Sequence, residues 1–143
     1  MNFTTESKAE DRKVEAYLIN RHGRIGALPR HFGQHAPIFE GFIYDLMRQF
    51  SQDYQGGMWE MFQLSNGGLL MTPPNPTLNI NIPSNGYVGQ MTGEAAGITV
   101  CLFAFSHLSF RFRHTEVFSR HFYRLRDFAL GHPESAEIFA AID

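Results

Sequence analysis

The sequence has a single cysteine, little net charge and no apolar run long enough to cross a membrane. Cys101 has no second thiol to pair with, so no intrachain disulfide can form, and a reducing compartment is expected. The longest apolar stretch, 98–105, is far shorter than the roughly 18 residues of a membrane span. The first residues are rich in charge and lack the apolar core of a secretory signal. We therefore expect a cytoplasmic protein with no membrane partner.

The small net charge excludes two classes of DNA-related protein. Lys and Arg total 12 against 14 for Asp and Glu, so the formal net charge at pH 7 is −2. A protein that imitates DNA needs a dense field of carboxylates, because duplex DNA carries roughly one charge per 1.7 Å of its axis. A strongly basic nucleic-acid-binding domain is excluded for the opposite reason. Neither DNA mimicry nor direct DNA binding is the primary expectation.

Positive charge is nevertheless concentrated in one segment. Five arginines occur in the segment Arg111–Arg126, after a stretch, 49–110, that has no lysine or arginine. Arg120 and Arg124 lie one helical turn apart, and Tyr123 beside them could stack on a base. The Arg111–Arg126 cationic face is therefore a candidate nucleic-acid-binding module.

The same segment also has the spacing of an ordinary solvent-exposed helix. Glu116 precedes Arg120 by four residues, and Asp127 follows Arg124 by three, which are favourable spacings for intrahelical ion pairs. A salt-bridged face of this kind needs no ligand. Both interpretations, a solvent face and a binding surface for nucleic acid or protein, stay open at this point.

The first half of the chain contains two helical patterns of unequal strength. In Pro37–Phe50 apolar residues recur at the three-and-four spacing of an amphipathic helix. Nearer the start, Val14, Tyr17 and Leu18 predict a weak helix that ends in the turn-prone run around Gly23.

The middle of the chain has the patterns of strands. The apolar runs Met58–Leu64 and Leu69–Thr72 are typical of strands, and Asn66 and Gly67 between them predict a tight hairpin. Apolar residues alternate with asparagine in Leu78–Ile82, which predicts a third strand with one buried face.

The last third of the chain returns to helical patterns. Thr92 can cap a helix that is apolar on nearly every side and therefore central. An apolar stripe over 118–129 predicts a second helix, which Gly131 ends by adopting a left-handed conformation. A short terminal helix follows Pro133. The fold class is thus α+β, a single compact domain with a small antiparallel sheet of about three strands packed with four to five helices.

Histidine is abundant, but its spacing does not indicate a metal site. His107, His114 and His121 are seven residues apart, or about 10.5 Å along a helix, whereas zinc ligands lie about 2 Å from the ion. His31 and His35 have helical ligand spacing, but the glycine and proline nearby make a continuous helix doubtful there. We expect structural or surface histidines and no bound metal.

Three further groups were weighed as catalytic residues. Cys101 lies in an apolar helix, which opposes thiolate formation. Ser106 and His107 are sequence neighbours whose side chains point about 100° apart on a helix. Glu60 could be a tuned carboxylate, but in a strand it more often faces water. The sequence therefore predicts no catalytic residue, no cofactor and no enzymatic activity.

Four segments carry a resemblance to a known family. In chain order they lie within Leu28–Gly33, Tyr54–Gly68, Glu94–His107 and His121–Asp143. Together they resemble the ArdB/KlcA antirestriction proteins from about Leu28 to the last residue. The resemblance divides the chain into a divergent, partly mobile N-terminal segment, 1–26, and an antirestriction domain, 27–143.

The resemblance implies a compact α+β protein, encoded on mobile genetic elements such as plasmids, that relieves type I restriction–modification of incoming DNA. It implies a non-enzymatic inhibitor that acts, directly or indirectly, on the type I restriction enzyme complex or an associated host factor. Because the family has no established catalytic site, shared residues can only be nominated as a functional surface. The nominees are Trp59, Asn66, Gly67, Tyr123, Arg124 and Asp127.

Each nominee also has a structural explanation that stays open. Trp59 could be a core residue, and Asn66 and Gly67 could serve only the turn. Arg124 and Asp127 could be an intrahelical ion pair.

Overall fold

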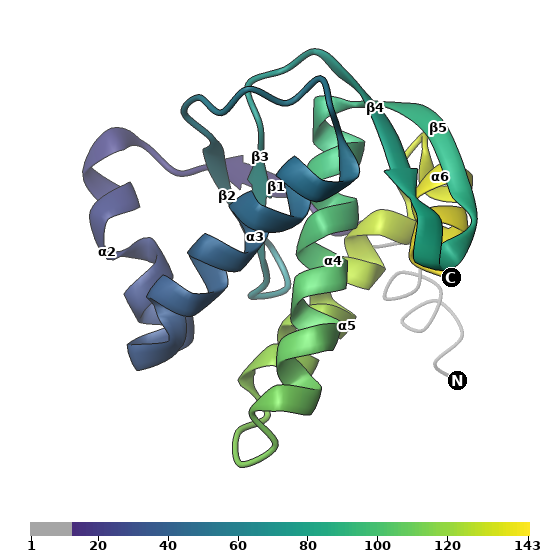
Figure 1. Ribbon diagram of the computed structural model, residues 1–143. Coiled ribbons are helices and arrows are strands. Elements are labelled where there is room, and N and C mark those ends of the chain that lie inside the picture. Colours follow the sequence, from purple (N-terminus) through teal and green to yellow (C-terminus); the bar gives the residue numbers. More distant parts are fainter. Residues whose placement is uncertain (1–12) are drawn as a thin grey trace, which may run out of the picture.

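One apolar helix, α4 (Gly93–Arg111), occupies the centre of the protein (Figure 1). Both sheets contact it, as do the helices α3 (Ala36–Phe50), α5 (Val117–Leu130) and α6 (Ser135–Ile142). The computed structural model describes residues 13–143, so the predicted mobility of the first residues falls largely outside the described part. As predicted, Thr92 caps α4, its hydroxyl oxygen accepting a hydrogen bond from the Ala95 N–H at 3.2 Å. α4 is long and apolar enough to cross a membrane, but 67% of its most apolar 18-residue stretch is buried inside the protein, as in a core helix.

The first sheet contains the predicted hairpin and one strand that the sequence did not reveal. Its antiparallel order is β1 (Ala16–Leu18), β2 (Glu60–Leu64) and β3 (Leu69–Thr72), with Tyr17 opposite Gln63 and Met61 opposite Met71. The weak helix predicted around Val14 to Leu18 is wrong, because Ala16–Leu18 pair with β2 as an exposed edge strand.

A second, two-stranded sheet is formed by β4 (Thr77–Ile82) and β5 (Tyr87–Thr92). The predicted alternation of β4 is confirmed, with Leu78, Ile80 and Ile82 buried and the residues between them exposed. Its partner is β5 and not the hairpin. β5 was not predicted, because its polar and glycine residues interrupt the apolar pattern.

The N-terminal helices follow one another almost without interruption. α2 (Arg21–Phe32) continues through Gly23, so the helix end predicted there is wrong; the Asn20 side chain instead starts α2 by accepting from the Gly23 N–H at 2.9 Å. Gly33, with φ +56°, ends α2 in a conformation that favours glycine. A single 3-10 turn, η1 (Gly33–His35), leads into the predicted helix α3 (Ala36–Phe50).

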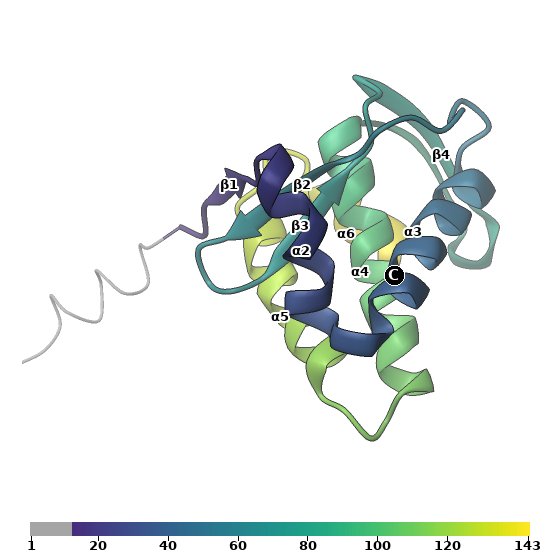
Figure 2. The same cartoon turned by 90° about the vertical axis from the view of Figure 1, so that its left-hand side faces the viewer.

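The C-terminal helices α5 (Val117–Leu130) and α6 (Ser135–Ile142) cover the other side of α4. Both views show α4 and α5 as an antiparallel pair whose connecting loop projects from the body (Figures 1 and 2). Gly131 ends α5 with φ −92°, so the left-handed conformation predicted for it is wrong.

Aromatic side chains dominate the core between α3, α4 and α5. Phe39 and Phe105 stack with their planes 1° apart, and Phe32 stacks on Phe118 at 5.7 Å between ring centroids. Burial of each such side chain stabilises the fold by about 1.5–3 kcal/mol. This core fixes α5, and with it the surface described next.

Candidate functional site

The tip of the β2–β3 hairpin is held by its asparagine and glycine, as the sequence predicts. Gly67 has φ +92°, a conformation that other residues rarely adopt. The Asn66 side-chain oxygen accepts a hydrogen bond from the Gly68 N–H at 3.1 Å, which closes the turn.

The same asparagine docks the hairpin onto α5. Its Nδ2 donates to the backbone carbonyl oxygen of Arg124 at 2.8 Å, across 58 residues of sequence. In return, Arg124 Nη1 lies 3.5 Å from the Gly67 carbonyl oxygen. A Cβ on Gly67 would lie 3.4 Å from the Arg124 Cζ, so the guanidinium packs directly on the turn.

Two more nominees lie beside this contact on α5. Tyr123 is 62% exposed, and Asp127, one turn further along, is also exposed. Residues four apart share a helix face, so both side chains extend the same patch. We call Asn66, Gly67, Tyr123, Arg124 and Asp127 the hairpin–α5 surface.

Trp59 does not belong to this surface. It is 1% exposed, and its indole Nε1 donates to the Tyr54 hydroxyl oxygen at 2.7 Å inside the core. The structure therefore places Trp59 as a core residue, the alternative that the sequence left open, and corrects its nomination as a surface residue.

The ion pairs predicted on α5 are absent from the described residues 13–143. No carboxylate oxygen lies within 4.0 Å of Arg120 or Arg124 there, because the Arg124 guanidinium turns toward Gly67. Two other arginines of the cationic face, Arg111 and Arg126, lie over the rings of Phe112 and Phe139. The ion pairs on which the solvent-face interpretation rested are therefore a wrong prediction for residues 13–143.

A pair of adjacent histidines, the half-buried His31 and the buried His121, was not predicted as a unit. His31 Nε2 lies 2.9 Å from the Gln63 Oε1, and the His31 and His121 rings meet edge to face at 5.0 Å. Burial, reinforced by the proximity of the His31 imidazole and the positive charge of Arg124, lowers the pKa of His121 to about 3. The His121 ring is therefore neutral at neutral pH.

The structure brings no pair of the candidate catalytic residues into a hydrogen bond within residues 13–143. Cys101 is fully buried, and burial raises the pKa of its thiol to about 12. Glu60 is exposed at the start of β2, which confirms the expectation that it faces water. No hydrogen bond joins Ser106 to His107, and no group of three potential metal ligands occurs among the described residues.

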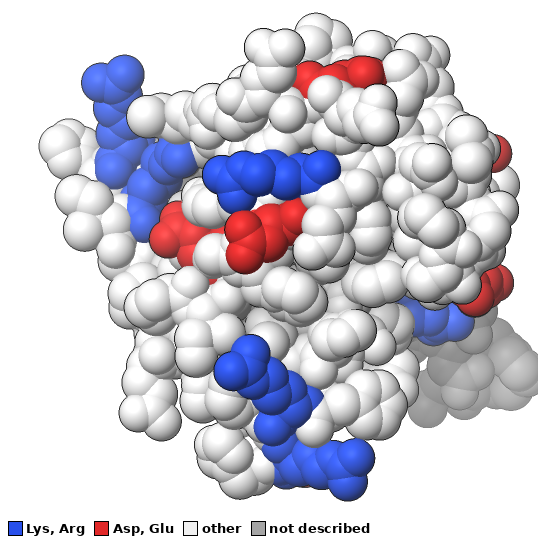
Figure 3. All heavy atoms as spheres, in the orientation of Figure 1, with Lys and Arg blue, Asp and Glu red and all other residues white. Residues whose placement is uncertain are grey.

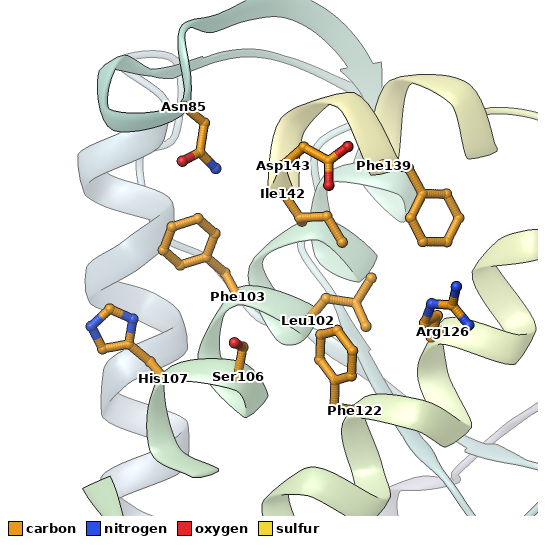
Figure 4. A pocket seen from close by; sticks show the side chains of 10 residues that line it. All are labelled: Asn85, Leu102, Phe103, Ser106, His107, Phe122, Arg126, Phe139, Ile142 and Asp143. Carbon is orange, nitrogen blue, oxygen red and sulfur yellow. The ribbon is translucent and has the colours of Figure 1, made fainter. Parts of the chain in front are cut away.

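A cavity of about 500 Å³ opens between α4, α5 and α6, and its lining shares no residue with the hairpin–α5 surface (Figure 4). No sequence pattern predicted it, because its walls come from three helices and the turn after β4. Its lining combines aromatic, apolar and charged side chains: Asn85, Leu102, Phe103, Ser106, His107, Phe122, Arg126, Phe139, Ile142 and Asp143.

Comparison with known proteins gives consistent matches along the chain. A family model described as "Antirestriction protein" matches residues 52–143. The antirestriction protein KlcA of Escherichia coli is 34% identical over 139 residues, which cover 94% of this chain and 98% of KlcA. The Escherichia coli K12 protein YafX is 39% identical over 125 residues, covering 84% and 82% of the two chains.

A solved structure gives the same result for the fold. It comes from work on KlcA and ArdB, which describes a novel fold and antirestriction activity against type I DNA restriction systems in vivo but not in vitro. It matches with a TM-score of 0.84 and 35% sequence identity, over 92% of this chain and 96% of the other.

Proposed function

Because this chain belongs to the ArdB/KlcA family of antirestriction proteins, we propose that it relieves type I restriction of unmodified incoming DNA. The observation that carries the proposal is the match in sequence and fold along nearly the whole chain to KlcA and ArdB. The single buried thiol also suits the reducing cytoplasm in which restriction occurs.

The protein acts without imitating DNA. Its net charge of −2 is far from the charge density of a duplex. The face drawn in Figure 3 supports this, since acidic and basic groups are scattered over a largely uncharged surface.

The protein also acts without catalysis. Its lone thiol is buried and has a raised pKa, which removes the nucleophile that the sequence offers. Ser106 and His107 are not hydrogen bonded to each other, so no activated hydroxyl is supported at that position.

The partner is the type I restriction complex or a host factor associated with it. KlcA and ArdB act in vivo but not in vitro, which favours a component of the cell as the direct partner. We assign contact with that partner to the exposed part of the hairpin–α5 surface, where Tyr123 offers a large amphipathic ring and Asp127 a charge.

The competing function is DNA binding by the Arg111–Arg126 face. It is favoured by one observation, that Arg120 and Arg124 have no carboxylate within 4.0 Å among residues 13–143. Counterion release separates the two functions: DNA affinity carried by these arginines would fall steeply between about 50 and 200 mM salt, and relief of restriction through protein contacts needs no such affinity.

The deciding experiment is the plating efficiency of unmodified phage on cells with an active type I system, with and without the expressed protein. We expect a rise of orders of magnitude, and no change in cells without the system. Tyr123→Ala and Asp127→Asn should each remove most of the rise. Phe110→Ala, which removes another exposed aromatic side chain (69% exposed) far along α4, is the matched control and should keep it.

Two results would contradict the proposal. Unchanged plating with folded protein present in the cells would refute antirestriction activity. Full activity in both the Tyr123 and Asp127 variants would refute the assignment to the hairpin–α5 surface while leaving the function in place.

A further inference from the structure

The cavity between α4, α5 and α6 has three phenylalanine rings in a wall that is otherwise partly polar. Phe103, Phe122 and Phe139 each come from a different helix and are each partly buried against the core. Leu102, fully buried, lies at the bottom. Figure 4 shows these side chains arranged around a common open space. A volume of about 500 Å³ is in the range of sites that hold small molecules.

A cation lies on one side of this interior. The Arg126 guanidinium lies over the Phe139 ring, with its Cζ 5.9 Å from the ring centroid. Among residues 13–143 no carboxylate oxygen lies within 4.0 Å of it. Stacking on the ring orients the guanidinium without using its hydrogen-bond donors, so these donors are free for an anion.

The other side of the cavity is aromatic. The His107 ring lies nearly parallel to Phe103, 14° apart in plane and 6.1 Å between centroids. In Figure 4 these two rings face Arg126 and Phe139 across the cavity, with Ser106 between. A ligand that spans the opening therefore meets rings along its length and a cation at one end.

We propose that this cavity binds small aromatic carboxylates, with the ring among the phenylalanines and the carboxylate on Arg126. Aromatic pairs gain from edge-to-face and offset contacts, and a guanidinium can hold a carboxylate through two parallel N–H donors. Asp143, which lines the same cavity, repels the carboxylate from its own position and so favours the Arg126 end. This site adjoins the hairpin–α5 surface, because the Phe122 and Tyr123 rings meet edge to face at 5.4 Å, but it shares no residue with that surface and does not depend on the antirestriction function.

The test is an NMR titration of the ¹⁵N-labelled full chain with three probes of nearly equal size. Phenylacetate carries the carboxylate, 2-phenylacetamide is its neutral counterpart, and phenethylamine is cationic. Phenylacetate should bind about tenfold more tightly than phenylacetamide, since a charge-assisted hydrogen bond adds a factor of this size. Phenethylamine should bind most weakly. The shifted amides should belong to α4, α5, α6 and the turn at Asn85.

Four variants separate the parts of the site. Arg126→Gln should bring phenylacetate down to the affinity of phenylacetamide, whereas Arg21→Gln, an exposed arginine on α2, should change nothing. Ser106→Phe fills the opening and should abolish binding of all three probes. Asp143→Asn should strengthen phenylacetate binding severalfold. Amide spectra of each variant show whether the fold is kept.

Three outcomes would overturn the proposal. They are equal affinity for phenylacetate and phenylacetamide in the wild type, saturable shifts confined to other parts of the protein, and no saturable shift with phenylacetate up to about 20 mM.

Discussion

The packing of α4 against β3 predicts that replacing a glycine with alanine lowers the free energy of unfolding in α4, whereas the same replacement raises it in α3. Gly97 lies one turn into α4, and a Cβ there would be 2.4 Å from the Met71 carbonyl oxygen and 2.9 Å from the Thr72 Cα. Gly41 lies in α3, is exposed, and a Cβ there would meet nothing within 4 Å. Both substitutions are Gly→Ala in a helix interior, so their intrinsic effect on helix formation is the same.

The magnitudes follow from these distances. Gly41→Ala should raise the free energy of unfolding by about 0.5–1 kcal/mol, the usual gain in helix propensity. Gly97→Ala has the same gain, but α4 and the β3 backbone must separate by roughly 0.6 Å to relieve the contact. Overpacking of a core costs about 1–3 kcal/mol, and here backbone atoms are forced apart. We expect a net loss of about 2 kcal/mol or more, because a packed backbone yields less than a side chain.

Urea unfolding of both variants measures this difference directly. Trp59 is the only tryptophan and is buried, so its fluorescence reports loss of the core. The midpoint for Gly41→Ala should rise and that for Gly97→Ala should fall, with unchanged slopes. A Gly97→Ala variant as stable as the wild type would refute the close approach of α4 to β3.

Three further predictions concern buried and half-buried polar groups. Because burial raises the pKa of the Cys101 thiol to about 12, Ellman's reagent at pH 8 should react only after unfolding, and rapid labelling of the folded protein would contradict this burial. Because burial lowers the pKa of His121 to about 3, the unfolded chain, with an imidazole pKa near 6.5, binds a proton that the folded protein does not. The free energy of unfolding should therefore fall as the pH drops from about 6.5 toward 3, by up to about 1.4 kcal/mol per pH unit, and His121→Gln but not His22→Gln should reduce this slope in urea titrations. Asn66→Ala removes both hydrogen bonds of the hairpin tip and should cost about 1–3 kcal/mol by urea unfolding, against little change for Asn81→Ala on the exposed face of β4.

The elements that were predicted correctly from the sequence are those determined by residues close to one another along the chain. Asn66 and Gly67 predicted the hairpin because the turn itself needs a residue at positive φ. Thr92 predicted the start of α4 because the cap contacts an amide three residues away. The amphipathic stripes of α3 and α5 were visible for the same reason, since a helix repeats its buried face every three or four residues.

The elements that it missed are stabilised by distant partners. β1 is exposed throughout and exists because it pairs with β2, more than 40 residues away. β5 likewise depends on β4 and on α6, whose Glu137 carboxylate accepts a hydrogen bond from the Tyr87 hydroxyl at 2.6 Å. Neither strand has an apolar pattern of its own strong enough to predict it.

The candidate site likewise has features that depend on distant parts of the chain and were not predicted from the sequence. Helical spacing predicted an Arg124–Asp127 ion pair, but the guanidinium of Arg124 lies instead against the Gly67 carbonyl oxygen of the hairpin. Only the tertiary fold brings these two groups together. The cavity between α4, α5 and α6 was equally invisible, because no single element contains its lining.

The structure also changes what the family resemblance says about function. Trp59 fills the core, Gly97 permits a close backbone approach, and Gly67 serves a turn at positive φ, so each of them has a structural reason for its identity. A residue explained in this way gives no evidence of a partner. Tyr123 and Asp127 are different, since both are exposed and their side chains form no hydrogen bond within residues 13–143. If one patch of this fold contacts the restriction system, these two residues are where loss of activity without loss of stability should be found.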